Sequence, residues 1–360
     1  MVLLKRGWKH LFLPCLAGAF AGLMLCFPGE AAQAAADACL LWATAVLPSL
    51  FPFLVCMLWI TGSIHSKEKG GISRLLGLPK IFLPVLAQGL FAGSPGGARL
   101  SQELDIKDDP GKKAALQRFA LYAGTMSPMF FVGTLGGWLH NPALGWVLLL
   151  SHWLGALITG QLSRLLFPCH PLDAGKDEKA GGTPALSRVV SSAAMTMLMV
   201  CGLMMLGSAA AAMVQSLLPG APDGILAGLQ AFLEVTAGCS RLLSLAMPQA
   251  LPALRPALLC AAASFGGMSI LLQNYAFLQQ DGVPLAFLLL GRLCHGFLSF
   301  CLCLLLSPLA GPSVSPASGP IMDLPRAIPV VSLVLWFFSL LCTAKASRQS
   351  SGRPSAFGLF

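Results

Sequence analysis

The fold of this chain is decided by the stretch Gly89-Leu90-Phe91-Ala92-Gly93-Ser94-Pro95-Gly96-Gly97-Ala98-Arg99-Leu100. It ends an apolar run that begins near Ile81, and its glycines and proline interrupt what would otherwise be a short membrane segment. Backbone that is broken in this way cannot face lipid, because its N–H and C=O groups would have no hydrogen-bond partners. The segment must therefore be buried in protein or line a cavity, which is where secondary transporters bind their substrates.

The composition indicates a polytopic α-helical membrane protein. Of the 360 residues, 56% are hydrophobic and only 10% are charged, whereas a soluble domain carries about 25% charged residues. The formal charge of +9 is expected in cytoplasmic loops, since excess Lys and Arg mark that side of a membrane protein. No basic patch indicates a nucleic-acid partner. The 12 cysteines are scattered singly through apolar runs, so neither a disulfide framework nor a metal site is expected.

Apolar runs predict an all-α protein with about eight transmembrane helices and two re-entrant hairpins. A span needs about 20 residues, and the last predicted helix is shorter than that. The first run has a basic start and is followed by the alanine-rich stretch 31–38, so it also imitates a secretory signal peptide. We favour an uncleaved helix, because a long membrane domain follows. The hairpins are expected at 81–100 and 225–245, and the helices at 11–27, 43–62, 114–137, 144–167, 189–218, 254–278, 284–306 and 328–342.

The polar loop 168–188 divides the chain into halves that share the order span, broken segment, interrupted span, span. We expect five parts: an N-terminal membrane helix and linker, a first repeat, a cytoplasmic loop, a second repeat, and a final part with a loop, the last helix and a basic tail. Their ranges are 1–42, 43–167, 168–188, 189–308 and 309–360.

The basic residues set the orientation of these halves. With both termini cytoplasmic and both hairpins re-entrant, 19 of the 23 Lys and Arg residues lie on the cytoplasmic side, as the positive-inside rule requires. Each half then has an odd number of spans, so the halves must be inverted relative to each other. An inverted repeat of this kind is typical of secondary transporters.

Polar residues at and near the breaks are the candidates for substrate binding. A half-helix that ends inside the membrane presents free N–H groups and a positive dipole end, and Arg99 adds a guanidinium that matches a carboxylate. Arg292 lies deep in a span, where an ionisable residue is a functional candidate by default. The predicted substrate-binding set is Ser94, Gly96, Gly97, Arg99, Ser127, Glu234, Thr236, Gly238, Ser264, Gly266, Gly267, Ser269 and Arg292.

These assignments have structural alternatives. Arg99 sits at a segment end and could snorkel to the interface, and the hydroxyl groups could only satisfy freed backbone groups. An ion pair between Arg292 and Glu234 would be structural for both. Glu234, His152 and His295 are candidates for proton coupling, since burial favours the neutral form of a carboxyl group, but the alternative of a packing histidine is favoured over a substrate role for His152. No H-E-x-x-H, G-x-S-x-G or P-loop motif is present, so no catalytic site, metal or cofactor is expected.

Four motifs occur in a fixed order: Gly93-Ser94-Pro95-Gly96-Gly97-Ala98-Arg99, Ser127-Pro128-Met129-Phe130, Glu234-Val235-Thr236-Ala237-Gly238 and Ser264-Phe265-Gly266-Gly267-Met268-Ser269-Ile270. Together they resemble the YlbJ family of sporulation integral membrane proteins, also called stage V sporulation protein V. The resemblance covers about 43–306. A Pro-x-Gly-Ala-Lys pattern is usual in the first motif of that family. Here Arg99 replaces the lysine, and the positive charge is kept.

The resemblance implies a nucleoside-recognition Gate domain, which also occurs in concentrative nucleoside and ferrous-iron transporters. It further implies a role in spore formation, in the mother-cell-derived outer membrane of the forespore, where the family is held to move dipicolinic acid. Dipicolinate is a small aromatic dianion whose carboxylates would suit half-helix ends with Arg99 and Arg292. Expected partners are this anionic solute, membrane lipids, and either further copies of the chain or other sporulation membrane proteins.

Three functions stay open on the sequence. The first is a transporter or facilitator of a small organic anion, with dipicolinate preferred and a nucleoside second. The next is a non-transporting membrane scaffold or sensor needed for spore cortex or maturation. A membrane enzyme acting on lipid-linked substrates is disfavoured for want of catalytic groups.

Overall fold

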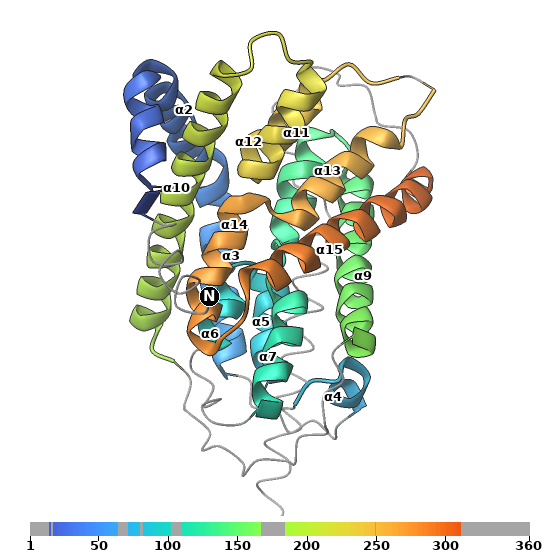
Figure 1. The fold of residues 1–360 in the computed structure, drawn as a ribbon. Coiled ribbons are helices and arrows are strands. Elements are labelled where there is room, and N and C mark those ends of the chain that lie inside the picture. The colour runs from blue at the N-terminus through green and yellow to red at the C-terminus, as the bar shows by residue number, and fades with distance from the viewer. Residues whose placement is uncertain are drawn as a thin grey trace, which may run out of the picture.

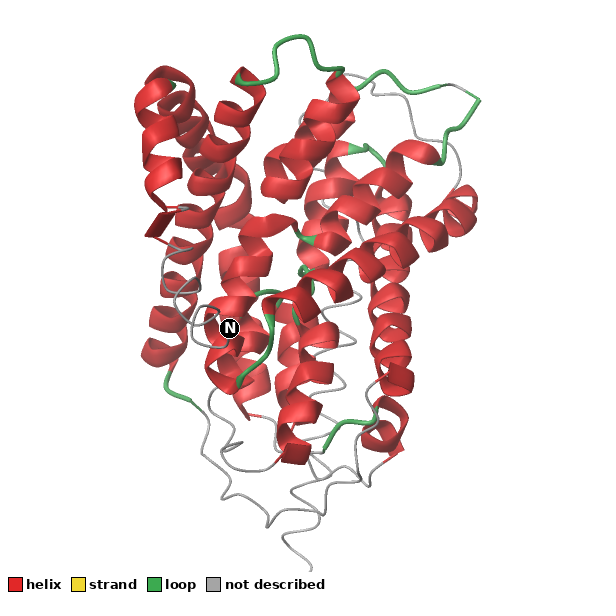
Figure 2. Ribbon diagram, viewed as in Figure 1, coloured by secondary structure: helices red, strands yellow, loops and turns green. Residues whose placement is uncertain are grey.

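The computed structural model describes residues 14–15, 17–63, 71–79, 82–101, 110–166, 184–248 and 250–310. Within these ranges every regular element is a helix (Figures 1 and 2), which confirms the predicted all-α class for this part of the chain. Two short stretches, Trp42–Val46 and Phe130–Leu135, are π-helical. The α-helices are α2 (Pro28–Leu41), α3 (Leu47–Ser63), α4 (Gly71–Leu76), α5 (Phe82–Ala92), α6 (Gly96–Ser101), α7 (Pro110–Ala123), α8 (Gly136–Trp138), α9 (Pro142–Leu166), α10 (Leu186–Ser216), α11 (Asp223–Leu233), α12 (Val235–Ser244), α13 (Leu254–Phe265), α14 (Gly267–Leu278) and α15 (Leu285–Leu306).

Helices long and apolar enough to cross a membrane are fewer than the eight predicted. The described part has four, or up to five if the bent pair Pro28–Val46 and Leu50–Ile60 is one span. The chain is thus a helical membrane protein, but eight spans are not confirmed. The range 114–137 was expected as a span interrupted at Ser127-Pro128, and the structure has a break between α7 and the π-helical stretch Phe130–Leu135. The predicted helix 328–342 lies outside the described residues. The four are Pro142–Arg164, Leu186–Ser216, Leu254–Asp281 and Leu285–Ala310.

The first broken segment consists of α5 and α6, joined by a turn at Gly93 with a φ of +78°. The two half-helices are so close that a Cβ on Gly97 would come within 2.8 Å of the Gly89 Cα. At the turn, the backbone N–H of Ser94 donates to the Thr125 carbonyl at 2.8 Å. The backbone freed by the break is therefore satisfied by the neighbouring interrupted segment, as burial in a membrane protein requires.

The second broken segment is built in the same way from α11 and α12. Glu234 alone separates them, with an extended backbone at φ −139° and ψ 118°. A Cβ on Gly238 would overlap the backbone of Ala231, so the two half-helices approach this closely only because residue 238 has no side chain. Likewise, α13 and α14 are separated by Gly266 alone, at φ +86°, where glycine avoids the strain that other residues would meet.

The order of elements recurs along the chain. The elements α3, α5–α6, the interrupted α7 and α9 are followed by α10, α11–α12, the interrupted α13–α14 and α15. In Figure 1 the pair α5–α6 lies in the lower part of the molecule and the pair α11–α12 in the upper part. The two broken segments therefore come from opposite ends of the molecule. The domain boundaries drawn from the sequence stay a prediction.

The alanine-rich stretch 31–38, which imitates a signal-peptide cleavage region, is helical and packs against α10. Ala31 is buried with Ala209 and Met213 in one apolar cluster, and Ala38 is buried with Met204 in the next. This part of α2 therefore contributes to the packing of the described structure.

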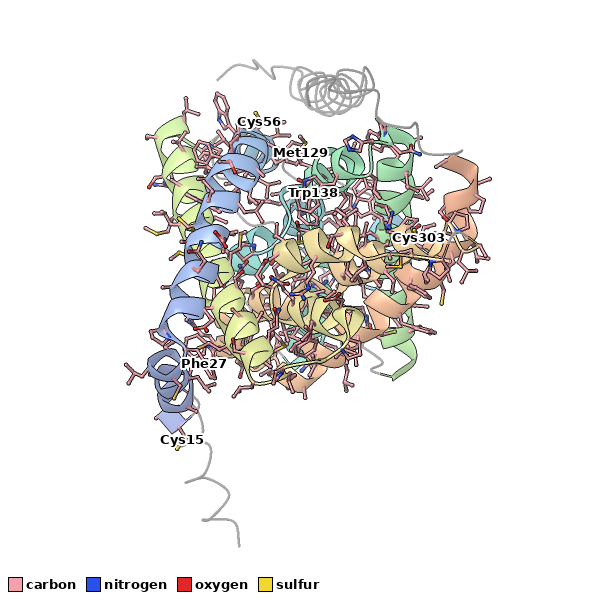
Figure 3. The ribbon with its side chains drawn as sticks, turned by 90° about the horizontal axis from the view of Figure 1, so that it is seen from above. Cys15, Phe27, Cys56, Met129, Trp138 and Cys303 are labelled. Carbon is pink, nitrogen blue, oxygen red and sulfur yellow. The ribbon has the colours of Figure 1, made fainter. Side chains whose placement is uncertain are left out.

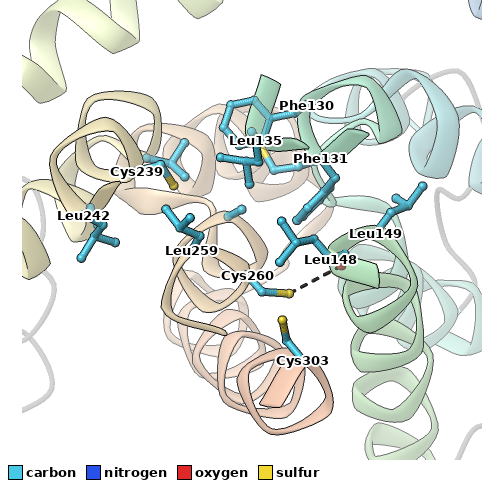
Figure 4. Packing of buried hydrophobic residues seen from close by; sticks show 14 of the residues in the cluster. Phe130, Phe131, Leu135, Leu148, Leu149, Cys239, Leu242, Leu259, Cys260 and Cys303 are labelled. Carbon is cyan, nitrogen blue, oxygen red and sulfur yellow. Dashed lines mark hydrogen bonds between the residues drawn. The ribbon is translucent and has the colours of Figure 1, made fainter. Parts of the chain in front are cut away.

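The largest apolar cluster joins α9, α12, α13 and the π-helical stretch Phe130–Leu135 (Figure 4). Inside it, Cys260 donates from Sγ to the Leu148 carbonyl at 3.5 Å. The cysteines of the described ranges are free, and Figure 3 shows Cys15, Cys56 and Cys303 far apart. No group of three or more His, Cys, Asp and Glu residues in those ranges could hold a metal ion.

Gly238→Ala is expected to destabilise the fold by about 1–3 kcal/mol, the usual cost of overpacking, because the added Cβ would overlap Ala231. The matched control is Gly228→Ala on α11, where a Cβ would meet no atom within 4 Å. Thermal unfolding of both purified variants in the same detergent measures the difference. If Gly238→Ala were as stable as the control, the close packing of α11 on α12 would be wrong.

Candidate functional site

The two helix breaks meet at one buried pocket. It is lined by Ser94 at the first break, Glu234 and Thr236 at the second, Ser127 before the π-helical stretch Phe130–Leu135, and Ser269 on α14. The pocket has a volume of about 50 Å³, enough for a few water molecules at roughly 10–15 Å³ each. The structure thus brings together five polar side chains that the sequence pattern selected.

Glu234 occupies the positive end of α12. Its side chain is 1% exposed, and its carboxylate accepts hydrogen bonds from the backbone N–H groups of Thr236, at 3.0 Å, and Ala237, at 2.7 Å. The sequence analysis assigned these donors and the helix dipole to a substrate anion. In this conformation the chain's own carboxylate fills that position, so the expected free half-helix end is not found at α12.

Two polar atoms in the pocket, Ser127 Oγ and Gln273 Oε1, have no hydrogen-bond partner in the described structure. Their side chains are 5% and 1% exposed. Burying an unpartnered polar atom costs about 1–3 kcal/mol, so this pocket is suited to a ligand with hydrogen-bonding groups. Gln273 was not among the predicted residues, although it lies four residues after Ser269 on the same face of α14. That spacing could have identified it.

Behind Ser94, the polar side chains of Asn274 and Arg292 lie around Gly124. The Ser94 hydroxyl donates to Asn274 Oδ1 at 2.9 Å. A Cβ on Gly124 would lie 3.0 Å from Asn274 Nδ2 and would overlap the Arg292 guanidinium. The missing side chain at Gly124 therefore makes the space in which Arg292, 4% exposed, is held.

Arg292, His295 and His152 form a buried row. Arg292 Nη1 lies 3.5 Å from His295 Nδ1, and His295 Nε2 lies 2.9 Å from the His152 carbonyl. Because a carbonyl only accepts, Nε2 of His295 carries the proton and Nδ1 accepts from Arg292. The two imidazole rings are 4.7 Å apart between centroids, and His152 Nδ1 is 2.8 Å from Ser264 Oγ. This row adjoins the pocket but does not line it.

Within the described residues, no carboxylate pairs with Arg292. Among the described residues, the hydrogen-bond partners of its guanidinium are His295 and the Ala120 carbonyl, the latter at 3.4 Å. The structural alternative of an ion pair between Arg292 and Glu234 is therefore not found. A buried guanidinium without an acidic partner is costly and is suited to binding a carboxylate.

The remaining predicted residues lie outside the pocket. Arg99 donates from Nη1 to Ser192 Oγ at 2.9 Å and to the Ser192 carbonyl at 3.3 Å, so it connects α6 to α10 instead of facing the pocket. The predicted glycines sit at the turns and close contacts of the broken helices: Gly96, Gly97, Gly238, Gly266 and Gly267.

No protein-family model and no solved structure matches the chain. Among curated proteins, it is similar to the sporulation integral membrane protein YlbJ of Bacillus subtilis (strain 168), with 30% identity over 137 residues. The match covers 34% of this chain and 32% of that protein. The chain thus spans about a third of the length of this relative. The name of the relative is that of the family that the four motifs resemble.

Glu234→Ala is expected to lower the free energy of unfolding by about 0.5–2 kcal/mol, the usual cost of losing a helix N-cap, because two backbone N–H groups lose their acceptor. Glu234→Gln keeps one acceptor oxygen and should fall between the parent and Glu234→Ala. Thermal unfolding checks both, with Ser240→Ala on the exposed side of α12 as the control. Equal melting temperatures for Glu234→Ala and the parent would contradict the capping role.

Proposed function

We propose that this protein is a sporulation membrane transporter or facilitator that moves a small organic anion across the outer forespore membrane, with dipicolinic acid as the preferred solute. The similarity to a sporulation integral membrane protein and the four motifs support the setting. The role that we propose is not enzymatic and uses no cofactor. The solute itself, membrane lipids and sporulation membrane proteins or further copies of the chain are the proposed partners.

The observation that carries the proposal is the convergence of both helix breaks on one buried pocket, with Arg292 behind it and no acidic partner for Arg292 in the described residues. Irregular backbone is tolerated in a membrane protein where it lines a cavity, and broken helices that meet at the interface between two repeats are where secondary transporters bind solutes. The unpartnered Ser127 Oγ adds a hydrogen-bond donor for a carboxylate.

The architecture that we propose is an inverted repeat of eight spans and two re-entrant hairpins, with both termini cytoplasmic and a Gate-like domain in each half. Support comes from the recurring order of elements and from the placement of α5–α6 and α11–α12 toward opposite ends of the molecule (Figure 1).

The pocket must widen to hold dipicolinate, because ligand pockets usually offer about 300–1,000 Å³. We propose that one carboxylate replaces Asn274 as the partner of Ser94 and reaches the Arg292 guanidinium. The other would accept hydrogen bonds from the hydroxyl groups of Ser127 and Thr236. This arrangement uses both acidic groups of the solute and leaves its ring against the apolar wall.

A nucleoside-type solute is the second candidate, and Glu234 favours it. A carboxylate that lines the pocket repels an anion but accepts hydrogen bonds from sugar hydroxyls. Protonation of Glu234 would remove that repulsion, so anion transport through this pocket would be coupled to a proton. We propose Glu234 first for this coupling, and then the row of His152 and His295.

Saturable uptake of labelled dipicolinate is expected in proteoliposomes that contain the purified protein. Arg292→Ala should reduce it by about 10- to 100-fold, since hydrogen bonds to charged groups contribute about 1.5–3 kcal/mol. The control is Arg255→Ala, which removes a guanidinium that contacts the Leu245 carbonyl outside the pocket.

Uridine is measured in parallel with dipicolinate. Uptake of uridine alone would favour the nucleoside alternative. Uptake of neither solute by folded protein would contradict transport and favour the scaffold. Uptake that survives in Arg292→Ala would overturn the assignment of this residue.

Ser127→Ala is expected to raise the KM for dipicolinate while leaving the melting temperature unchanged or slightly higher, because a buried hydroxyl without a partner is removed. Ser151→Ala is the matched control, since its hydroxyl donates to the Val147 carbonyl at 2.8 Å inside α9. This control should lose stability and keep its KM. A lower melting temperature with unchanged KM in Ser127→Ala would mean that the hydroxyl is structural.

A further inference from the structure

A second cavity lies beside the central pocket, between α2, α10 and α12. The volume of this cavity is about 480 Å³, and that of the central pocket is about 50 Å³. Its lining mixes apolar and polar side chains, and the polar ones include Ser208, Gln215, Gln230 and Arg241. Asp37, also in the lining, is exposed. This cavity is thus larger and more polar than the pocket, and it opens to the surface.

The two cavities follow each other along the same helices. On α10, Val200 and Met204 line the central pocket, while Ser208 and Gln215, further along the same face, line the second cavity. On α12, Thr236 lines the central pocket and the following turns line the second cavity. The same order holds along the N-terminal helices. Residues of α2 between 34 and 41 line the second cavity, and residues between 46 and 54, at and after the start of α3, line the central pocket.

An apolar collar separates the two cavities. It is formed by Ala38, Val46 and Met204, which are 3%, 4% and 3% exposed and pack in one cluster. Beside the collar, α10 touches the second break, since a Cβ on Gly207 would come within 3.0 Å of Glu234 Cβ. The barrier between the cavities is therefore only about one helical turn thick, from Met204 to Ser208 on α10.

We propose that the second cavity is a vestibule that binds the solute before it reaches the central pocket, and that the collar is the gate between them. This inference rests on the proposed function and extends it from a pocket to a path. A second observation points to a ligand in the vestibule. Ser208, 3% exposed, lines the cavity directly beyond the collar, and its Oγ has no hydrogen-bond partner among the residues that the structure describes.

The vestibule takes a small polar solute without selecting its charge. Arg241 lines it but is held by Gln215 Oε1 at 2.8 Å and by Asp223 Oδ1 at 3.4 Å, and Asp37 lies across the same cavity. The positive and negative groups therefore offset each other. Selection of an anion is left to Arg292 behind the central pocket, which has no acidic partner among the described residues.

The chain beside the collar has a built-in bend. Trp42–Val46 is π-helical between α2 and α3, and the pair Pro28–Val46 and Leu50–Ile60 is bent by 59°. Single π-helical turns are frequent at functional sites. A swing of α2 about this bend would separate Ala38 from Met204, which opens the gate without unfolding α10.

Thiol accessibility tests the path without requiring transport. Ser208→Cys places a thiol in the vestibule and Ser269→Cys places one in the central pocket. The full chain in lipid nanodiscs is treated with a negatively charged, membrane-impermeant methanethiosulfonate, and tandem mass spectrometry locates each modified residue against the native cysteines of the parent. With a gate open about 0.1–10% of the time, Ser269→Cys should react about 10- to 1,000-fold more slowly than Ser208→Cys.

Met204→Ala is expected to accelerate the reaction at Ser269→Cys and leave that at Ser208→Cys unchanged. Met195→Ala, on a 63% exposed residue of the same helix, is the matched control and should change neither. An unreactive Ser208→Cys, or a Ser269→Cys that Met204→Ala does not accelerate, would overturn the proposal.

The native cysteines Cys39 and Cys201 allow the gate to be locked, because their Sγ atoms lie 4.0 Å apart between α2 and α10. Cross-linking them by oxidation should slow the reaction at Ser269→Cys and stop solute uptake, and reduction should restore both. Cys39→Ser is the control. Uptake that continues after the cross-link is shown to be complete would overturn the path and leave the proposed function intact. If the thiols react as expected but the reduced protein transports no solute, the proposed function would be contradicted and the path between the two cavities would stand.

Discussion

Backbone hydrogen bonding inside an apolar environment is the constraint on which this structure depends. Both broken segments satisfy it within the protein: the N–H of Ser94 reaches the Thr125 carbonyl, and the Glu234 carboxylate accepts from the first N–H groups of α12. Because each break needs polar neighbours, the two breaks bring polar side chains into the interior. The central pocket forms where these side chains meet.

Glycines at the close contacts between helices are as important for this structure as the polar side chains. Gly97 and Gly238 let the half-helices of each broken segment touch, and Gly124 leaves the space that the Arg292 guanidinium fills. Close approach of this kind is the main source of stability between helices in lipid, where burial of apolar surface contributes little. Glu234 and Arg292 do not pair with each other in the described residues: the Glu234 carboxylate caps α12, and Arg292 is left without an acidic partner.

Much of the architecture follows from local patterns in the sequence. Hydropathy defines the helical membrane class. Glycine and proline mark the first broken segment and the polar pair Glu234 and Thr236 marks the second, since each pattern acts over a few neighbouring residues. The polar residues chosen beside these interruptions include the ones that line the pocket: Ser94, Ser127, Glu234, Thr236 and Ser269. The number of spans was less secure, because an apolar run shows neither how long its helix is nor how sharply that helix bends: eight spans were predicted, and four or up to five helices in the described residues are long and apolar enough to cross a membrane.

The sequence by itself therefore determined the class of protein, the positions of the breaks and most of the polar residues in the pocket. Only the tertiary structure decided that Arg99 contacts α10 while Arg292 lies behind the pocket, that Glu234 fills the helix end expected to be free, and that Gln273 joins the lining. These facts depend on which helices pack side by side and on where each side chain then finds a partner. Neither is encoded in the spacing of residues along one segment, because the partners lie far apart in the chain.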